Sequence, residues 1–196
     1  MSGSAITQVP RSNALFSVRE LVALAHPGLV YLFQGESDVL YVAMQEMIDR
    51  LALQAPVQVV AGGNRISFEH LPLIAGEQIG NIYEILDRIW VSRDETCYQM
   101  QDVLQALKPS AAPLVITDML ASFYEDDLTD REVTIVLKNC LAHIQRISET
   151  APVLISARAD AVRPALIEML ERRADMRFYF EPSNPPNELQ TVLTGM

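Results

Sequence analysis

Six apolar runs alternate with amphipathic segments along the chain, and this alternation constrains the fold more than any other feature. The runs occupy residues 29–33, 57–60, 89–92, 113–118, 151–156 and 176–180. The run at 113–118 is apolar at nearly every position, which is typical of a parallel strand buried on both faces. Parallel strands need crossover connections, usually helices. The sequence therefore predicts an α/β fold: a mostly parallel sheet with helices on both faces, in three layers.

Helix limits are marked by capping residues. Ser17 with Glu20 and Thr129 with Glu132 both match a capping box, in which the two side chains satisfy free N–H groups at a helix start. Ser37 or Asp38 is expected to cap the helix after the first strand, and Asp94 to cap the helix after the third. A further helix is predicted from about 161 to 173.

Composition predicts one domain over residues 1–196. The 196 residues are 49% hydrophobic, enough for one sizeable core, and no internal repeat or linker is visible. Residues 1–13 are polar and expected to fray. The segment 181–196 reads as a Pro-rich tail.

Charge and cysteine content narrow the possible environments. The formal net charge of −10 disfavours direct binding to a phosphate backbone. Cys97 and Cys140 fall at apolar helical positions, which predicts buried, reduced thiols. No run approaches the roughly 20 apolar residues that span a bilayer, and no signal peptide is visible. We expect a soluble cytoplasmic protein with no membrane contact.

The first strand, its loop Gln34–Asp38 and the following helix form the setting in which a phosphate-binding loop would lie. Such a loop reads G-x-x-x-x-G-K-[ST], where Lys holds phosphate and the hydroxyl reaches Mg²⁺. Counting from Gly35, these last three positions hold Leu40, Tyr41 and Val42. The setting is present, but the residues that bind phosphate and metal are absent.

Several local strings, in order, resemble the core of the RecA-type recombinases and their archaeal and eukaryotic relatives, over roughly residues 29–157. They are the Gly35 loop, Gly62-Gly-Asn-Arg65, Ile89-Trp-Val-Ser-Arg93 with Cys97-Tyr-Gln99, Leu114-Val-Ile-Thr-Asp118 with Phe123-Tyr124, and Val153-Leu-Ile-Ser156. The resemblance implies a three-layer RecA-like, P-loop NTPase-type fold.

The resemblance also implies where catalytic groups should lie. The water-activating Glu of the family would fall at Gly62 or Gly63, and its polar sensor near Ser156 to Arg158, without a matching Asn-Gln pair. The acid that holds Mg²⁺ in the family is present as Asp118. Phosphoryl transfer depends on positioning and electrostatic stabilisation, so the chain is not expected to be an ATPase or to carry a cofactor.

Candidate binding residues fall into two groups. For a residual nucleotide site they are Gly35, Ser37, Asp38 and Asp118; Asp118 is also a candidate metal ligand, although no metal site is expected. For a partner surface they are Arg65, Trp90, Arg93 and Tyr98, because Arg and aromatic side chains together form binding hot spots or base-stacking platforms. Core packing of Trp90 and solvation of Arg93 are the favoured alternatives.

Two other clusters are weaker. Glu125, Asp126 and Asp127 could bind a divalent ion, but a solvated loop is favoured. The three histidines share no zinc-ligand spacing. Arginines of the last third, from Arg158 to Arg177, could form a local basic patch, although ordinary helix surfaces show the same spacing.

The leading hypothesis is a non-catalytic RecA-like domain that acts as an accessory or regulatory protein-interaction module in DNA repair or recombination. Its partner would be a second copy or a RecA-like protein. The alternatives are an ATPase with an atypical P-loop and a direct DNA-binding protein. Exposed aromatic residues are expected to mark the interface: Phe16, Phe123 and Tyr124 are candidates, whereas Phe178 and Phe180 are expected in the core.

Overall fold

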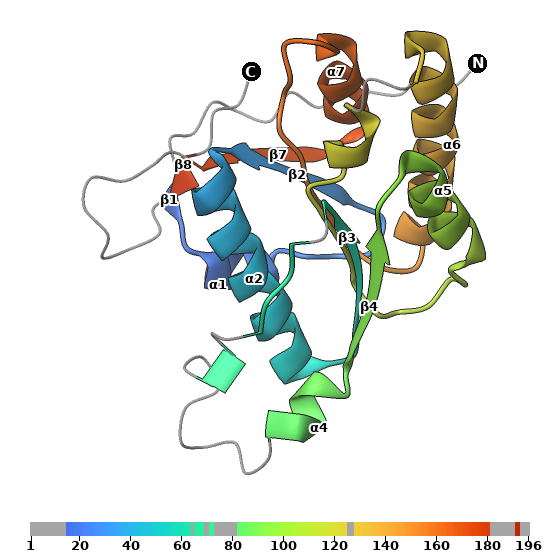
Figure 1. Ribbon diagram of the computed structural model, residues 1–196. Coiled ribbons are helices and arrows are strands. Elements are labelled where there is room, and N and C mark those ends of the chain that lie inside the picture. Colours follow the sequence, from blue (N-terminus) through green and yellow to red (C-terminus); the bar gives the residue numbers. More distant parts are fainter. Residues whose placement is uncertain are drawn as a thin grey trace, which may run out of the picture.

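The computed structural model describes residues 15–63, 65–68, 71–72, 82–124, 128–180 and 191–192. Within these residues the chain forms one eight-stranded sheet in the order β1-β8-β7-β2-β6-β5-β3-β4 (Figure 1). The six strands from β7 to β4 are all parallel. The two-residue strands β1 and β8 extend the sheet beyond β7 through antiparallel pairing.

The elements have the following limits. The strands are β1 (Leu15–Phe16), β2 (Val30–Gly35), β3 (Val57–Gly62), β4 (Ile89–Asp94), β5 (Leu114–Thr117), β6 (Val153–Ser156), β7 (Met176–Phe180) and β8 (Thr191–Val192). The helices are α1 (Val18–Ala23), α2 (Ser37–Gln54), α4 (Ile82–Leu86), α5 (Cys97–Ala106), the 3-10 helix η1 (Ala121–Phe123), α6 (Asp130–Ser148) and α7 (Pro164–Arg173).

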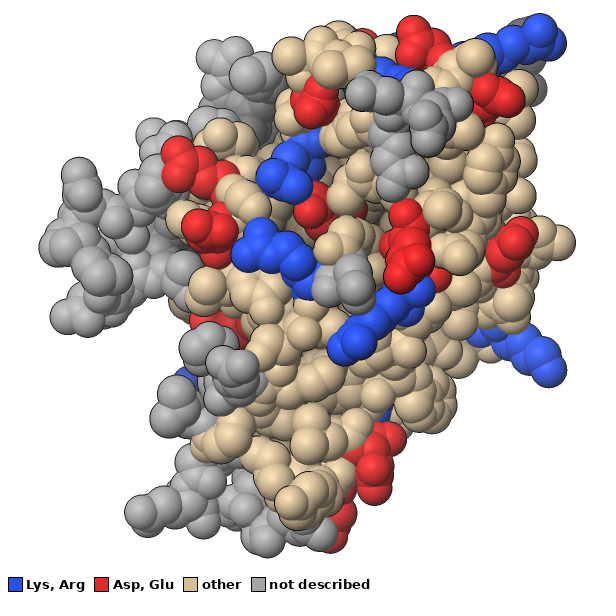
Figure 2. All heavy atoms as spheres, viewed as in Figure 1, with Lys and Arg blue, Asp and Glu red and all other residues tan. Residues whose placement is uncertain are grey.

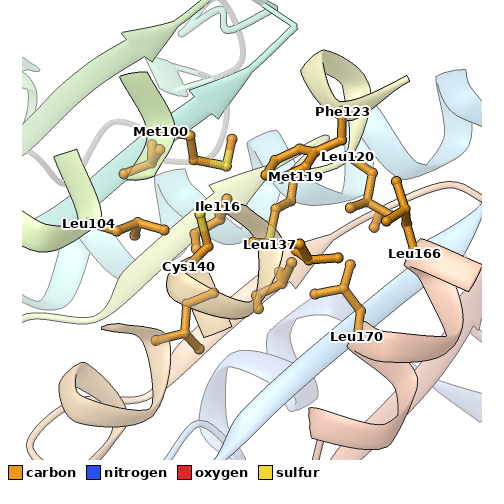
Figure 3. Packing of buried hydrophobic residues seen from close by; sticks show 14 of the residues in the cluster. Met100, Leu104, Ile116, Met119, Leu120, Phe123, Leu137, Cys140, Leu166 and Leu170 are labelled. Atoms are coloured by element: carbon orange, nitrogen blue, oxygen red, sulfur yellow. The ribbon is translucent and has the colours of Figure 1, made fainter. Parts of the chain in front are cut away.

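Helices cover both faces of the sheet, so the molecule has three layers (Figure 1). Helices α1, α2 and α4 pack on one face and α5, α6 and α7 on the other. The second face holds a cluster that includes Met100 of α5, Cys140 of α6 and Leu166 of α7 (Figure 3). Strands β5 and β6 are buried at every position, because their side chains enter both clusters.

Aromatic side chains pack between β2 and β7 on the α2 face. The rings of Phe33 and Phe178 are stacked with centroids 5.2 Å apart, and Phe180 lies 6.0 Å from Phe33. Gly35 permits the two strands to approach here, since a Cβ at that position would lie 2.4 Å from the carbonyl oxygen of Phe180. Glycine at the end of β2 thus serves strand pairing with β7.

Connections on opposite faces leave a crevice at the carboxyl ends of the strands. Helix α2 follows β2 on one face, whereas α7 follows the neighbouring strand β6 on the other. Open α/β sheets place ligands in such a crevice, where neighbouring connections diverge. A ligand site is therefore expected at the carboxyl ends of β2, β3, β5 and β6.

The fold class predicted from sequence is confirmed, while several helix limits differ. Both capping boxes form as predicted. Thr96, not Asp94, caps α5, because β4 continues through Asp94. Glu36 precedes α2 without a side-chain cap, so Ser37 lies inside the helix. Helix α7 begins at Pro164, since proline is favoured in a first helical turn.

In the described part of the chain, every helix is too short or too polar to span a bilayer.

Candidate functional site

A small cavity lies at the carboxyl ends of the central strands, in the position expected for a ligand. Its lining residues come from α2, from the turn after β3, and from the ends of β5 and β6: Ser37, Leu40, Tyr41, Met44, Arg65, Thr117, Asp118, Ser156 and Arg158. The cavity has a volume of about 20 Å³, enough for about one water molecule. With Arg65 and Arg158 in these positions, a nucleotide could enter only if the two side chains moved.

Asp118, immediately after β5, is held by an arginine from the neighbouring strand end. Arg158 donates from Nε to Oδ1 at 3.3 Å and from Nη2 to Oδ2 at 2.9 Å. This two-point geometry is the strongest common arrangement of an ion pair. The hydrogen bond to Asp118 raises the pKa of Arg158. A guanidinium thus lies on the carboxylate that would hold a metal in the resembled family.

The loops around this ion pair fix its position. The Asp118 backbone adopts φ = +47°, a left-handed conformation that Asp tolerates better than most residues. Its N–H donates to Ser156 Oγ at 2.8 Å. Tyr124 donates its hydroxyl to the Arg158 carbonyl at 2.8 Å, and burial raises the pKa of Tyr124 to about 12. The β5 and β6 ends are therefore tied together on both sides of the ion pair.

Gly62, at the end of β3, lies against the backbone of the same turn. A Cβ at Gly62 would be 2.6 Å from the Asp118 carbonyl oxygen and 2.9 Å from that of Thr117. The resemblance to the RecA-type recombinases implies that the water-activating Glu of that family would fall at Gly62 or Gly63. At Gly62, backbone packing leaves no space for any side chain without displacing the turn.

Arg65 closes the cavity from the opposite side. Its guanidinium lies over the Tyr41 ring, 4.7 Å from the centroid, and donates to Ser37 Oγ at 3.2 Å. It also forms a longer ion pair with Asp38, at 3.6 Å. The Tyr41 ring, in the second turn of α2, thus binds a cation of the chain itself.

The structure thus brings together three of the four predicted nucleotide-site residues. Ser37, Asp38 and Asp118 all contact arginines of this site, whereas Gly35 serves the β2–β7 pairing. Lys and Arg atoms gather near the centre of the face drawn in Figure 2, with acidic atoms around them. Opposite charges are interleaved here, and no single-sign surface for a polyanion forms.

One polar atom in the cavity wall has no partner. The Thr117 hydroxyl is buried, with the residue 5% exposed, and has no hydrogen-bond partner. The cavity is large enough to hold one water that could satisfy it. Within the described residues, no group of three His, Cys, Asp or Glu side chains is placed to bind a metal.

The predicted partner residues divide between two places. Arg65 belongs to the cavity, whereas Trp90 and Arg93 lie on β4 and Tyr98 on α5. Core packing was the favoured interpretation of Trp90, and it is wrong: Trp90 is 56% exposed. The reason is that β4 pairs only with β3 and forms the edge of the sheet, which sequence periodicity does not reveal.

Beside Trp90, the same edge carries further exposed apolar and cationic groups. Val91 and Tyr98 are among the exposed large hydrophobic residues, as is Tyr83 on the preceding helix α4. Arg93 is exposed, as predicted, and no ion pair or side-chain hydrogen bond joins it to another described residue. We call Trp90, Val91, Arg93 and Tyr98 the β4 edge surface.

Other predictions for binding residues have mixed outcomes. Phe123 is buried, which corrects its assignment to an exposed interface, whereas Phe178 and Phe180 are in the core as predicted. The side chain of Phe16 and the acidic residues at 125–127 lie outside the described parts. Tyr124 is half-buried.

The structure also excludes Arg163 from the basic patch considered for the last third of the chain, because this residue is buried. The residue is 8% exposed, and its guanidinium donates to the carbonyl oxygens of Phe123 and Leu128 and to the Asp130 carboxylate. It connects the two ends of the β5–α6 loop to the start of α7. Arg158 also contributes little to such a patch, because its guanidinium donates two hydrogen bonds to the Asp118 carboxylate.

Sequence reasoning missed the role of Arg158 and the stacking of Arg65 on Tyr41. A signal was available: Arg65 and Arg158 follow the apolar runs at 57–60 and 151–156, and the carboxyl ends of parallel strands lie at one edge of the sheet. Together they indicated that side chains of the chain itself could fill the space of a ligand.

These contacts describe a closed crevice in a three-layer α/β protein. No family model and no curated protein matches this chain in sequence, so the assignment of function depends on the geometry of the site and of the β4 edge surface.

Proposed function

We propose that the chain is a non-catalytic RecA-like domain that acts as an accessory or regulatory protein-interaction module in DNA repair or recombination. The observation that carries this proposal is the occupancy of the crevice by Arg158 on Asp118 and by Arg65 on Tyr41. With these side chains in place, the cavity holds about one water molecule, and the two arginines that line it are paired with Asp38 and Asp118. The assignment to the RecA-like group, and with it to repair or recombination, depends on the sequence resemblance alone.

The β4 edge surface supports a role in protein contacts. An edge strand presents unpaired backbone N–H and C=O groups, and natural proteins usually protect such edges with charges, prolines or covering segments. Here six consecutive residues of β4 pair on one side only, and Trp90 and Val91 are exposed on it. Tryptophan and arginine are the residue types most enriched in binding hot spots.

A second copy of the chain or a RecA-like protein is the proposed partner. An extended segment of that partner would add to β4 through backbone hydrogen bonds, with side chains contacting alternate faces. Exposed Arg93, without an ion pair to the described residues, would favour an acidic residue opposite it. The overall charge of −10 weakens attraction between copies, so salt is expected to strengthen any self-association.

Calorimetric titration with ATP and Mg²⁺ tests the absence of nucleotide binding. We expect no saturable heat, and a micromolar dissociation constant would refute that part of the proposal. Sedimentation or light scattering over a concentration series, alone and with a candidate RecA-like protein, tests the association.

A pair of variants makes the second test specific to the surface. Trp90→Glu with Arg93→Glu should abolish association while leaving the monomer folded, because both side chains are exposed. Val162→Glu is the matched control, since Val162 is 66% exposed and lies before α7, outside the β4 edge surface. Equal loss in both variants, or none in either, would contradict the assignment to β4.

A further inference from the structure

A cluster of unsatisfied polar atoms is buried on one face of α2. Gln45 and Asp49 lie one turn apart and are 1% and 0% exposed. Ser67 N–H donates to Gln45 Oε1 at 3.1 Å. Gln45 Nε2 and both carboxylate oxygens of Asp49 have no hydrogen-bond partner among the residues that the structure describes. Such groups are rare in folded proteins, because each loses its hydration without compensation.

The position of Asp49 follows from its neighbours on the helix. Gln45, one turn before it, contacts Ser67 after β3. One turn after it, the carbonyl oxygens of Ala52 and Leu53 accept from Arg88 Nη1, each at 3.3 Å. Residues three and four apart share a helix face. Asp49 therefore lies on α2 between two points that contact described parts of the β3–β4 connection, Gln45 next to Ser67 and the helix end next to Arg88.

Burial without partners favours the neutral form of a carboxyl group. The pKa of Asp49 is raised to about 7, mainly by burial and to a smaller extent by the negative charge of Glu46 on the preceding turn. Glu46 is itself paired with Arg50 at 2.6 Å. Near neutral pH the Asp49 proton is therefore lost while the side chain is still enclosed.

Other charged groups come from the elements around α2. They are Arg19 and Glu20 on α1, Arg65 before α4, Glu84 on α4, and Asp87 and Arg88 after α4; strands β2, β3 and β5 carry none. Arg88 is the nearest of these by its bonds to α2, but its Nη1 is committed to main-chain oxygens. No ion pair with Asp49 forms among the described residues.

The described segments of the β3–β4 connection next to this part of α2 are packed less completely than the sheet. Ile66, Phe68, Ile82 and Leu86 are only partly buried against the α2 cluster, and α4 has one fully buried residue, Ile85. Regions with few buried apolar contacts open locally at low free energy without global unfolding. This connection can therefore respond to a single buried charge.

We propose that Asp49 is a pH-sensitive latch: loss of its proton loosens the packing of α4 and residues 65–68 on α2. Because α4 leads directly into β4, the opening alters the mobility of the segment that enters the edge strand. The inference stands apart from the proposed function, since it concerns an equilibrium within the monomer.

The sign of the pH dependence follows from linkage. The closed form binds the Asp49 proton more tightly than the open form, so closure is most stable at low pH and weakens as pH rises toward about 7. With an open-form pKa of 3.8, the opening constant should rise about tenfold between pH 6 and pH 8 and then level off.

Hydrogen exchange of the full chain at several pH values tests the proposal, after correction for the pH dependence of intrinsic exchange. The amides of Asp87 and Arg88, which donate to the Tyr83 and Ile85 carbonyls of α4, should lose protection about tenfold from pH 6 to pH 8, whereas those of β5 should not. Asp49→Asn and Asp49→Leu should both remove this pH dependence. A wild-type profile that is flat, or an unchanged profile in either variant, would overturn the proposal.

Asp94→Asn provides the matched control. Asp94 is also buried, at 2% exposure, and burial raises its pKa, but it lies at the end of β4 on the other side of the connection. This variant should keep the pH response of α4; its loss would contradict the assignment to Asp49. If both Asp49 variants fail to fold, a carbon-13 titration of the wild-type carboxyl decides: a midpoint below about 5 refutes the latch, and one near 7 supports it.

Discussion

Arg158 donates hydrogen bonds to both carboxylate oxygens of Asp118, and the two residues follow the adjacent strands β6 and β5. Parallel pairing places these ends side by side, so the ion pair needs no long-range rearrangement to form. It closes the crevice on the side of η1, while Arg65 closes it on the side of α2.

The first prediction concerns this ion pair. Asp118→Asn and Arg158→Gln should each lower the free energy of unfolding by about 0.5–1 kcal/mol, because the pair is partly exposed. The double variant should lose little more than either single variant, since the interaction is already gone. Urea denaturation of the four proteins measures the cycle. Strictly additive losses would show that the two side chains do not interact.

A second prediction separates the backbone conformation at position 118 from its ion pair. Asp118→Ala should be less stable than Asp118→Asn by about 1 kcal/mol, since alanine lacks the tolerance of Asn for φ = +47°. Thermal and urea unfolding compare the two variants. Equal stability would mean that this conformation relaxes at no cost.

The third prediction tests the close approach at Gly62. Gly62→Ala should cost more than about 2 kcal/mol, because its Cβ would meet two carbonyl oxygens that cannot move independently of the sheet. The control is Gly28→Ala, where φ is +90° but no atom lies within 4 Å. The control should lose about 1 kcal/mol from conformation alone, and a larger loss there than at Gly62 would contradict the steric explanation.

The parallel sheet and its helices were predictable because burial on both faces leaves a continuous apolar signature in β5 and β6. The starts of α2 and α5 were harder to predict from sequence. Glu36 precedes α2 without a side-chain cap, and Asp94, which resembles a helix cap, is the last residue of β4. Trp90 was misplaced for a related reason. A strand has the same local sequence pattern at the edge of a sheet as inside it, and strand order is decided by contacts between distant segments.

Only one part of the closed crevice could be predicted from the sequence. The sequence has no lysine between Gly35 and Val42, and this excludes one way of holding phosphate. The occupants Arg65 and Arg158 are not visible, because they come from loops whose approach depends on how β3, β5 and β6 end. Asp49 shows a similar limit: a carboxylate in a helix reads as a surface residue until its surroundings are known.

The fourth prediction uses the single tryptophan of the chain. At 56% exposure, Trp90 should give the red-shifted emission of a hydrated indole and should be quenched readily by acrylamide in the folded protein. Binding of a partner on β4 should shift the emission to the blue and reduce quenching. Blue-shifted emission from the isolated monomer would contradict an exposed Trp90.

The fifth prediction concerns the two thiols. Cys97 and Cys140 are fully buried, and burial raises the pKa of Cys140 to about 12. Because the thiolate is the reactive form, neither thiol should react with iodoacetamide in the native protein at neutral pH, whereas both should react in urea. Rapid native labelling of either would show that the α5–α6 packing opens easily.

The occupants of the crevice are covalent parts of the chain, and this gives them a property that no dissociable ligand has. A bound nucleotide stabilises a protein by an amount that grows with the logarithm of its free concentration, so its effect rises and falls with supply. Arg158 and Arg65 are present at a fixed effective concentration set by the loops that carry them. The closed form of this crevice is therefore independent of dilution, dialysis and the energy charge of the surroundings.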